Sequence, residues 1–429
     1  DWHAFVETMS VAERTLREDP GGVYGRMDFA TRDHYRHVLE KIARRSGLAE
    51  EQVARSCVQL AREAAAKNVG DDRATHVGFY LVDRGLPQLE AVTRMPVPPT
   101  RMRVPPTRMR VPAFLALQRI RGRFIYFGPI ALMTVAFTGG LLAQAHASGA
   151  RGWLLVLCGI LALLGSSQLA VALVNWLATL IVAPKLLPRM DFSKGIAPGS
   201  QTLVVIPTLI YSAQNVEDMV EALEVRFLAN RDARLQFGLL TDFADAHEET
   251  LPQDEPLLQL AGQRIAELNE KYRATGTNRD DVFFLFHRPR RWNPRERIWM
   301  GYERKRGKLG ELNALLRGGA VDPFSRIVGR IAVLSGVRYV ITLDADTQLP
   351  RDSARQLAGT MAHPLNRARY DGARRRVTEG YGILQPRVAM SLTDTNRSRY
   401  AQLQGDEAGI DPYTRMVSDV YQDLFSEGS

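Results

Sequence analysis

The sequence predicts an α/β protein with a mostly parallel sheet flanked by helices, preceded by a two-helix transmembrane hairpin and an N-terminal helical region. Three observations predict this fold. Helical spacing of apolar residues dominates residues 1–93, two long apolar runs follow, and β-rich runs alternate with amphipathic stretches after residue 200. Such alternation is typical of parallel sheets, because parallel strands need crossover connections.

The composition is that of a globular protein with a large core. Of the 429 residues, 45% are hydrophobic and 24% are charged, and this length predicts about two or three domains. Two cysteines, Cys57 and Cys158, provide no disulfide framework and favour the cytoplasm. The net charge of +9 leaves nucleic acid, an anionic membrane surface or phosphorylated substrates as partners. The chain begins at Asp1 without Met, which predicts a fragment of a larger polypeptide, and no N-terminal signal peptide is visible.

Residues 1–93 are predicted to form an N-terminal helical cytoplasmic region. Arg32–Arg45 and Leu48–Lys67 show helical periodicity and predict a pair of packed helices, whereas His76–Gly85 fits either a short strand or a helix. Three side chains with metal-binding chemistry share one helix face: His34, His37 and Glu40. Because no fourth ligand or dry surrounding accompanies them, we interpret them as a solvated face.

Residues 94–123 are predicted to be a linker rich in proline and arginine. The heptad VPPTRMR occupies residues 97–103 and repeats at once as residues 104–110. Proline fixes φ and removes a backbone donor, so the tandem favours an extended polyproline-like conformation. A nucleic-acid-binding arm is the alternative. No aromatic platform accompanies the arginines, and we therefore expect no nucleic-acid partner.

Residues 124–182 are predicted to form a transmembrane helix hairpin. Phe124–Ala147 and Trp153–Val182 contain no Asp, Glu, Lys or Arg, and both exceed the roughly 20 residues that a spanning helix needs. Three aromatic residues suit the membrane interface: Tyr126, Trp153 and Trp176. The alternative is a buried helical hairpin of a soluble protein.

Basic residues at both outer ends of the hairpin predict its orientation. Three arginines precede the first helix, and three basic residues lie in or beside the juxtamembrane connector, residues 183–199: Arg119, Arg121 and Arg123, then Lys185, Arg189 and Lys194. Such residues stay on the cytoplasmic side of a bilayer, so both ends are predicted to be cytoplasmic. The lipid bilayer also accounts for much of the net positive charge.

Residues 200–429 carry the alternation of strands and helices. Four strands are predicted: Thr202–Ile206, Leu235–Leu240, Val282–Phe286 and Tyr339–Leu343. The last of them is predicted to be buried. Two helices are predicted between strands: Asn215–Ala229 and Glu255–Tyr272. In parallel sheets of this kind, ligands bind beyond the carboxyl ends of the strands.

Acidic side chains follow two of these strands. Asp344 and Asp346 come directly after Tyr339–Leu343, in the sequence LDADT, and Asp242 comes shortly after Leu235–Leu240. Two carboxylates spaced i, i+2 can bind Mg²⁺ or Mn²⁺, which in turn binds nucleotide phosphates. Asp242 can accept hydrogen bonds from a base or a ribose. The alternative is that these acids only cap the helices that follow.

A basic loop lies between the two acidic positions in the sequence. Residues 304–318, RKRGKLGELNALLRG, combine cationic side chains, including Lys308, with glycine and a helix pattern. Cations and the first amides of a helix can both contact an anion such as a diphosphate. A solvated basic turn is the alternative, but the acidic metal site predicted further along favours the anion.

These motifs, in this order, resemble membrane glycosyltransferases with a GT-A core, the cellulose-synthase-like class. More closely, four segments are similar to the cyclic β-1,2-glucan synthases, glycosyltransferase family 84: ERKRGKL, ITLDADTQLPRDSARQLAGTMAHPLNR, EGYGILQPRV and GIDPYTRMVSDVYQDLFSEGS. The resemblance covers nearly the whole chain. The VPPTRMR tandem has no counterpart in it.

The resemblance implies an inverting transferase that moves glucose from UDP-glucose to a glucan acceptor, a growing β-1,2-glucan, at the cytoplasmic face of a bacterial inner membrane. Residues 200–429 would then be an incomplete GT-A-like domain of a multi-pass protein. The resemblance assigns uridine to Asp242 with Thr208 nearby, the diphosphate to Lys308, and Mg²⁺ or Mn²⁺ to Asp346 with Asp344, the latter also beside the ribose. The general base is expected beyond residue 429, so the chain is expected to bind UDP-glucose without polymerising it.

Other interpretations stay open at this point. One alternative is a catalytically silent membrane module, and another is a processive transferase that makes a different β-glucan. A glycoside hydrolase would need paired carboxylates flanking a sugar cleft, whereas acids near a basic loop favour nucleotide-sugar transfer. Protein-linked glucan in the resembled family makes Tyr272 a candidate priming residue. The alternative for Tyr272 is an ordinary, partly buried tyrosine.

Overall fold

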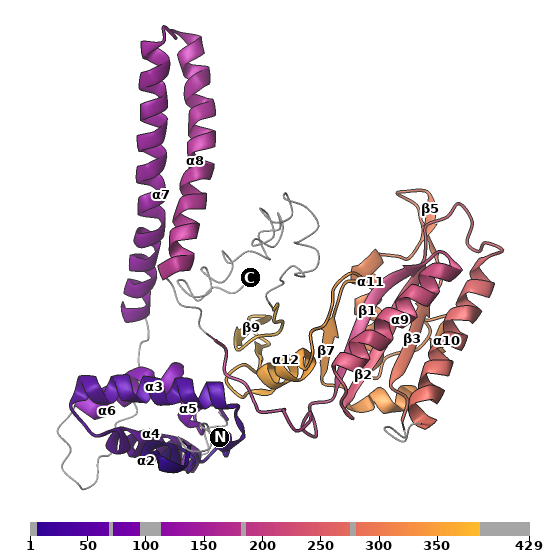
Figure 1. Ribbon diagram of the computed structural model, residues 1–429, viewed down its shortest axis with the longest axis horizontal. Helices are drawn as coiled ribbons and strands as arrows, with labels where there is room; N and C mark the ends of the chain where they lie inside the picture. The colour runs from indigo at the N-terminus through magenta and orange to yellow at the C-terminus, as the bar shows by residue number, and fades with distance from the viewer. Residues whose placement is uncertain (1–6, 68–71, 95–112, 182–185, 275–279, 387–429) are drawn as a thin grey trace. The chain divides into compact units, whose positions relative to one another are not determined.

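The computed structural model describes residues 7–67, 72–94, 113–181, 186–274 and 280–386 (Figure 1). The chain divides into two compact units, residues 1–97 with 187–382 and residues 98–186 with 383–429. The first unit holds the N-terminal helices and the sheet, and the second holds two long helices. The VPPTRMR tandem and the segment from residue 387 onward lie outside the described residues.

The N-terminal region is helical, as predicted. Its elements are α2 (Val11–Leu16), the 3₁₀ turn η1 (Tyr24–Arg26), α3 (Phe29–Ser46), α4 (Glu50–Ala66), α5 (Val77–Val82) and α6 (Leu86–Arg94). Asp28 caps α3 by accepting a hydrogen bond from the amide of Thr31, and Gly47 ends it with a φ of 72°. The segment that fits either a strand or a helix is helix α5.

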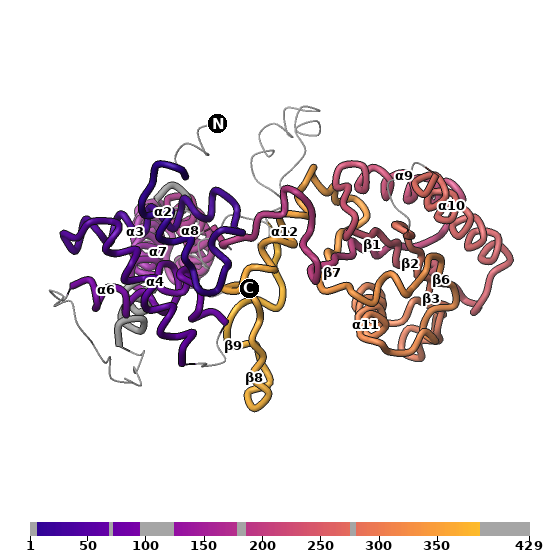
Figure 2. Tube along the Cα trace, turned by 90° about the horizontal axis from the view of Figure 1, so that it is seen from below, coloured from indigo at the N-terminus to yellow at the C-terminus, as the bar shows by residue number. Residues whose placement is uncertain are grey.

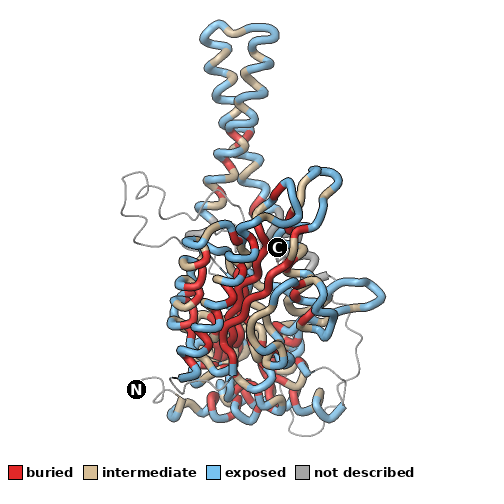
Figure 3. Tube along the Cα trace, turned by 90° about the vertical axis from the view of Figure 1, so that its right-hand side faces the viewer, coloured by how far each residue is buried: buried red, intermediate tan, exposed pale blue. Residues whose placement is uncertain are grey.

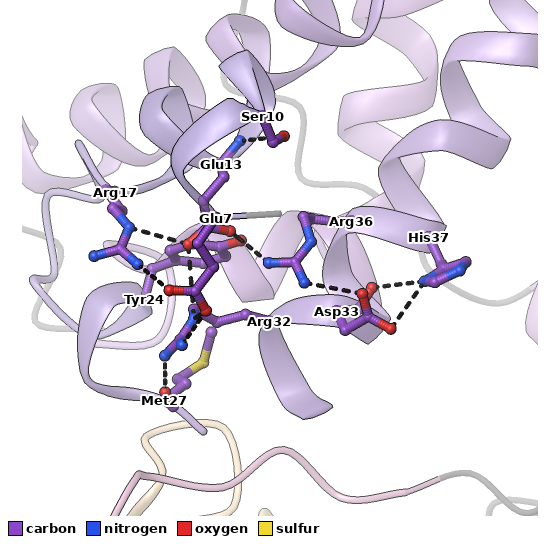
Figure 4. A network of polar contacts seen from close by, with 10 residues as sticks. All are labelled: Glu7, Ser10, Glu13, Arg17, Tyr24, Met27, Arg32, Asp33, Arg36 and His37. Atoms are coloured by element: carbon purple, nitrogen blue, oxygen red, sulfur yellow. Dashed lines mark hydrogen bonds and ion pairs between the residues drawn. The ribbon is translucent and has the colours of Figure 1, made fainter. Parts of the chain in front are cut away.

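A buried polar network crosses the core of this region (Figure 4). The carboxylate of Glu13 is fully buried and accepts hydrogen bonds from Tyr24 Oη at 2.6 Å, Arg36 Nη1 at 2.7 Å and Arg17 Nε at 3.0 Å. Burial and the neighbouring Glu13 raise the pKa of Tyr24. Because a buried carboxylate needs such donors, the network ties α2, η1 and α3 together.

The second unit contains an antiparallel pair of long helices, α7 (Ala113–Ala147) and α8 (Trp153–Ile181) (Figure 1). Within them, Phe124–Ala147 and Trp153–Leu177 are long and apolar enough to cross a bilayer. Only 11% of the most apolar part of each is buried. Such low burial does not fit the alternative of a buried hairpin in a soluble protein.

Two details of this hairpin differ from the prediction. α7 begins at Ala113, so the last residues of the predicted linker are helical. Tyr126, expected at the membrane interface, is 3% exposed and donates a hydrogen bond to Asn175 Oδ1 at 2.6 Å. Tyr126 therefore packs between the two helices, whereas Trp153 and Trp176 are exposed.

The central sheet has five strands in the order β6-β3-β2-β1-β7. They are β1 (Thr202–Ile210), β2 (Leu235–Phe243), β3 (Phe283–Arg288), β6 (Arg326–Val328) and β7 (Tyr339–Thr342). Only β6 is antiparallel to its neighbour, so the predicted mostly parallel sheet is confirmed. Helices α9 (Ala213–Ala229) and α10 (Asp254–Ala274) cover one face of the sheet, and α11 (Arg304–Leu316) covers the other (Figure 2).

The sheet buries apolar side chains on both faces. Val204, Phe237 and Phe283 pack towards α9 and α10, whereas Leu203 and Phe286 pack towards α11. All nine residues of β2 are buried, because this strand has a neighbour on each side and helices over both faces. The buried strands run between these two groups of apolar side chains (Figure 3).

The prediction that Tyr339–Leu343 is a buried strand is wrong about burial. β7 occupies Tyr339–Thr342, and its residues are half-buried except Thr342, which is exposed. Among the described residues, β7 pairs only with β1 and lies at one edge of the sheet. An edge strand has a single neighbouring strand, which leaves β7 less buried than β1 or β2.

The remaining elements lie outside the five-stranded sheet. They are the hairpin β4 (Arg291–Asn293) and β5 (Ile298–Met300), the 3₁₀ turn η2 (Ile331–Gly336), helix α12 (Ser353–Ala362), and the hairpin β8 (Arg369–Asp371) and β9 (Arg376–Glu379). β1 and β2 extend beyond their predicted ends. Thr208 and Asp242 therefore lie within strands rather than after them.

Candidate functional site

The parallel register brings the carboxyl ends of β1, β2 and β3 to one edge of the sheet. Leu209 aligns with Asp242, and Asp242 aligns with Arg288. Thr208 aligns with Thr241, next to Asp242. Thr208 and Asp242, predicted from separate parts of the sequence, are therefore neighbours at the edge where open α/β sheets bind ligands.

Asp242 is the centre of a buried ionic cluster, whose other members are Arg288, Lys308 and Glu311. Its side chain is 1% exposed. Arg288 donates from Nε to Oδ1 at 2.8 Å and from Nη2 to Oδ2 at 3.0 Å, and Lys308 Nζ lies 2.8 Å from Oδ2. Arg288 Nη1 also contacts Glu311 Oε2 at 2.8 Å. Two carboxylates and two cations balance in charge, which keeps the cost of burying them low.

Lys308 is fully engaged in this cluster. Its side chain is 4% exposed, and Nζ also donates a hydrogen bond to the carbonyl oxygen of Thr208 at 2.8 Å. Burial lowers the pKa of Lys308, and the attraction of Asp242 opposes this effect. The structure thus brings Asp242 and Lys308 together with the backbone of Thr208, whose hydroxyl contacts Met219 Sδ on α9 at 3.2 Å instead. The contact of Lys308 with a diphosphate stays a prediction.

Arg288, Glu311 and Gly301 are missing from the predicted site. Arg288 is the last residue of β3, so the strand-end argument that selects Asp242 would also have selected it. Glu311 lies three residues after Lys308 on α11, close to the same face of the helix. A Cβ on Gly301 would lie 2.3 Å from Asp242 Oδ2, so glycine is needed where this loop covers the carboxylate.

A buried histidine lies beside the ionic cluster. Thr241 Oγ1 lies 2.8 Å from Nδ1 of His287, and the ring centroids of His287 and Phe243 are 4.2 Å apart. Burial lowers the pKa of His287 to about 4, although Asp242 acts in the opposite direction. Among the described residues, none forms a hydrogen bond with Nε2. The imidazole is therefore neutral at pH 7.

The predicted metal-binding pair, Asp344 and Asp346, lies in the turn after β7. Both residues are exposed, and Lys305 Nζ forms an ion pair with Asp344. Arg226 on α9 donates hydrogen bonds at 2.7 Å to the carbonyl oxygens on either side of Asp346. Because Arg226 is only 6% exposed, a buried cation fixes the backbone of this turn.

The chemistry of this turn suits a hard divalent cation. Mg²⁺ and Mn²⁺ favour carboxylate oxygens, and an exposed turn leaves space for water and phosphate oxygens as further ligands. In the part of the chain that the structure describes, no group of three or more His, Cys, Asp or Glu side chains could hold a metal ion. His34, His37 and Glu40 accordingly form no such group. A cation at Asp344 and Asp346 would depend on phosphate and water for its other ligands.

Tyr272, the candidate priming residue, lies away from the site. Its hydroxyl forms a hydrogen bond with Glu224, and its ring centroid lies 4.7 Å from that of Phe227 and 5.7 Å from that of Phe283. Phe283 is the first residue of β3, so Tyr272 lies near the amino ends of the strands, whereas Asp242 lies at the carboxyl ends. We interpret Tyr272 as a structural residue.

Sequence comparison with known proteins tests the resemblance to the cyclic β-1,2-glucan synthases. The chain is 39% identical, over 433 aligned residues, to cyclic β-(1,2)-glucan synthase NdvB of Rhizobium meliloti (strain 1021). The alignment covers 100% of the chain and 15% of this relative. No protein-family model matches the chain. The resemblance is thereby confirmed, and the chain corresponds along its whole length to one segment of a cyclic β-1,2-glucan synthase.

Proposed function

We propose that this chain is the nucleotide-sugar-binding part of a membrane glycosyltransferase that moves glucose from UDP-glucose to a growing β-1,2-glucan. The arrangement of charges at the carboxyl edge of the sheet supports this proposal. The buried Asp242 cluster lies at the ends of β2 and β3, and the exposed Asp344–Asp346 turn follows β7, with β1 between them. A nucleotide sugar likewise has a base at one end and charged phosphates beyond it. The similarity to a glucan synthase segment supports the same function.

Asp242 is proposed to recognise the uracil base. A carboxylate can accept about four hydrogen bonds. Arg288 uses one position on Oδ1, while Arg288 and Lys308 use two on Oδ2. The remaining position on Oδ1 can accept the imide N–H of uracil. Because Asp242 is 1% exposed, this contact requires the loop around Gly301 to move.

Asp344 and Asp346 are proposed to hold Mg²⁺ or Mn²⁺ at the phosphate end, with Asp344 also beside the ribose. When bound, such an ion neutralises negative charge on the departing UDP. Arg226 supports the carboxylates by fixing the backbone on either side of Asp346. Inverting transfer also needs a general base for the acceptor hydroxyl, and we assign this role to none of the described residues. We therefore expect donor binding without polymerisation.

The two long apolar helices fit a multi-pass protein of a bacterial inner membrane. Arg189 and Lys194 follow the second helix, and basic residues next to a spanning helix favour the cytoplasmic side. We propose that the sheet and the N-terminal helices are both cytoplasmic, because an even number of spans returns the chain to the side from which it started.

Calorimetric titration of the detergent-purified chain with UDP tests this function. We expect binding that depends on Mn²⁺, a loss of at least about tenfold in affinity in Asp346→Ala, and a smaller loss in Asp344→Ala, because the phosphate charges lose compensation. Asp322→Ala, at an exposed acid in the loop after α11, is the matched control. An unchanged affinity in Asp346→Ala would contradict the metal assignment. Absence of UDP binding by the unaltered chain would indicate a catalytically silent module instead.

A further inference from the structure

A lysine at the start of α11 contacts the predicted metal-binding turn. Lys305 Nζ forms an ion pair with a carboxylate oxygen of Asp344, although the two residues are 39 positions apart in the sequence. Their side chains are 51% and 62% exposed. This ion pair is therefore accessible to solvent, and it brings the start of α11 to the turn that follows β7.

The other basic residues of the RKRGK segment are engaged elsewhere. Lys308 is buried in the ionic cluster around Asp242. Arg304 pairs with Asp245 at 2.8 Å, and Arg306 is 87% exposed with its ion-pair partner on its own helix turn. Of these cations, Lys305 is the one with a recorded ion pair to the metal-binding turn.

We propose that Lys305 is an exchangeable counter-ion of Asp344, which a divalent cation displaces when the donor binds and which then contacts the diphosphate. This inference rests on the proposed function. An exposed lysine–carboxylate pair is weakly held, so a divalent ion can replace it. The released ammonium is a mobile point charge on a flexible stem, and the start of a helix such as α11 also favours anions.

This exchange couples the binding of the two ligands. While Lys305 neutralises Asp344, a cation must compete with it for the carboxylate. With a diphosphate present, Lys305 has a new partner and the competition is relieved. Metal and nucleotide then raise each other's affinity by the same factor, as linkage requires. If Lys305 only supported the turn, its replacement would instead change the affinities for the metal and for the nucleotide in the same direction.

Lys305→Gln in the full chain tests the exchange, with Arg306→Gln as the matched control. Both substitutions remove one exposed positive charge from the same helix turn. For Mn²⁺ alone, followed by the electron paramagnetic resonance signal of the free ion, we expect Lys305→Gln to bind up to about fivefold tighter than the control. For UDP at saturating Mn²⁺, we expect Lys305→Gln to bind about tenfold more weakly.

Opposite changes in the two titrations support the exchange. It is overturned if Lys305→Gln matches Arg306→Gln in both titrations, or if it loses affinity for both ligands. Failure of the unaltered chain to bind UDP with Mn²⁺ would refute the proposed function instead. The titration with Mn²⁺ alone would still decide whether Lys305 competes for Asp344, because tighter binding supports the competition and unchanged binding overturns it.

Discussion

Arg288 is the residue whose replacement we expect to destabilise the site most. It is 4% exposed, donates two hydrogen bonds to Asp242 and contacts Glu311. Arg288→Met keeps an apolar stem of similar length but leaves two carboxylates with Lys308 as their cation within the cluster. Removing one partner of a buried ion pair costs about 3–5 kcal/mol, because the remaining charge stays buried without compensation.

Thermal unfolding of the detergent-purified chain, followed by circular dichroism, measures this cost. For a domain of about 150–250 residues, 1 kcal/mol corresponds to roughly 2–4 °C in Tm, so Arg288→Met should lower Tm by about 6–20 °C. Arg291→Met is the matched control, since Arg291 is 49% exposed and lies 3.5 Å from the same Glu311. An exposed pair contributes about 0–1 kcal/mol. Equal Tm values for the two variants would refute the argument that Arg288 compensates a buried charge at Asp242.

Two further changes test the surroundings of the site. Arg226→Gln removes the hydrogen bonds to the turn around Asp346 and should lower the Mn²⁺-dependent affinity for UDP about tenfold. Arg264→Gln, at an arginine whose side chain is 39% exposed, is the control. Equal UDP affinities of the two variants would contradict a role of Arg226 in holding the turn. The pKa of His287 is about 4 in the folded chain and about 6.5 in the unfolded chain. Because the unfolded chain binds the proton more readily, the contribution of His287 to the free energy of unfolding is complete above pH 6.5. It is lost as the pH falls towards 4, by up to about 3 kcal/mol. In urea unfolding, His287→Asn, which cannot titrate, should lose less stability between pH 7 and pH 4.5 than the unaltered chain. An equal loss in the two proteins would refute the lowered pKa of His287.

The four parallel strands of the sheet could be predicted from the sequence, but the short antiparallel strand β6 and the ends of the strands could not. The predicted first strand ends at Ile206, directly before Pro207, and proline cannot donate a ladder hydrogen bond. In the structure β1 continues to Ile210, and Pro207 pairs with Leu240 of β2. The ladder between β1 and β7 stops at Val205, so no ladder hydrogen bond to β7 is needed at Pro207. β1 can continue past Pro207 because β7 is short and pairs with β1 only as far as Val205. The pattern of residues within β1 contains no information about the length of β7.

The sequence selects Asp242 and Lys308 as candidates, but not the contact between them or the participation of Arg288 and Glu311. The assignment of the diphosphate to Lys308 comes from the resemblance alone. The spacing of residues along the helix, by contrast, indicates that the Lys308 side chain is buried. Lys308, Leu312 and Leu315 are spaced i, i+4, i+7, and all three are buried on the face of α11 that packs against the sheet. This spacing alone places Lys308 on an apolar face, where a lysine needs a buried carboxylate. Which carboxylate it meets depends on strand register and could not be predicted from α11 by itself.

The two acidic groups are linked by one short segment of the chain, from Gly301 to Lys308. Gly301 covers Asp242, and Lys308 neutralises it from within α11. Lys305 lies three residues earlier, about one helical turn from Lys308, and pairs with Asp344. Because both lysines belong to the same helix, any shift of α11 that accompanies movement of the loop over Asp242 also shifts the lysine at Asp344. α11 therefore contacts both ends of the proposed site, and a shift of this helix would link the proposed exchange at Asp344 to the proposed recognition of uracil at Asp242.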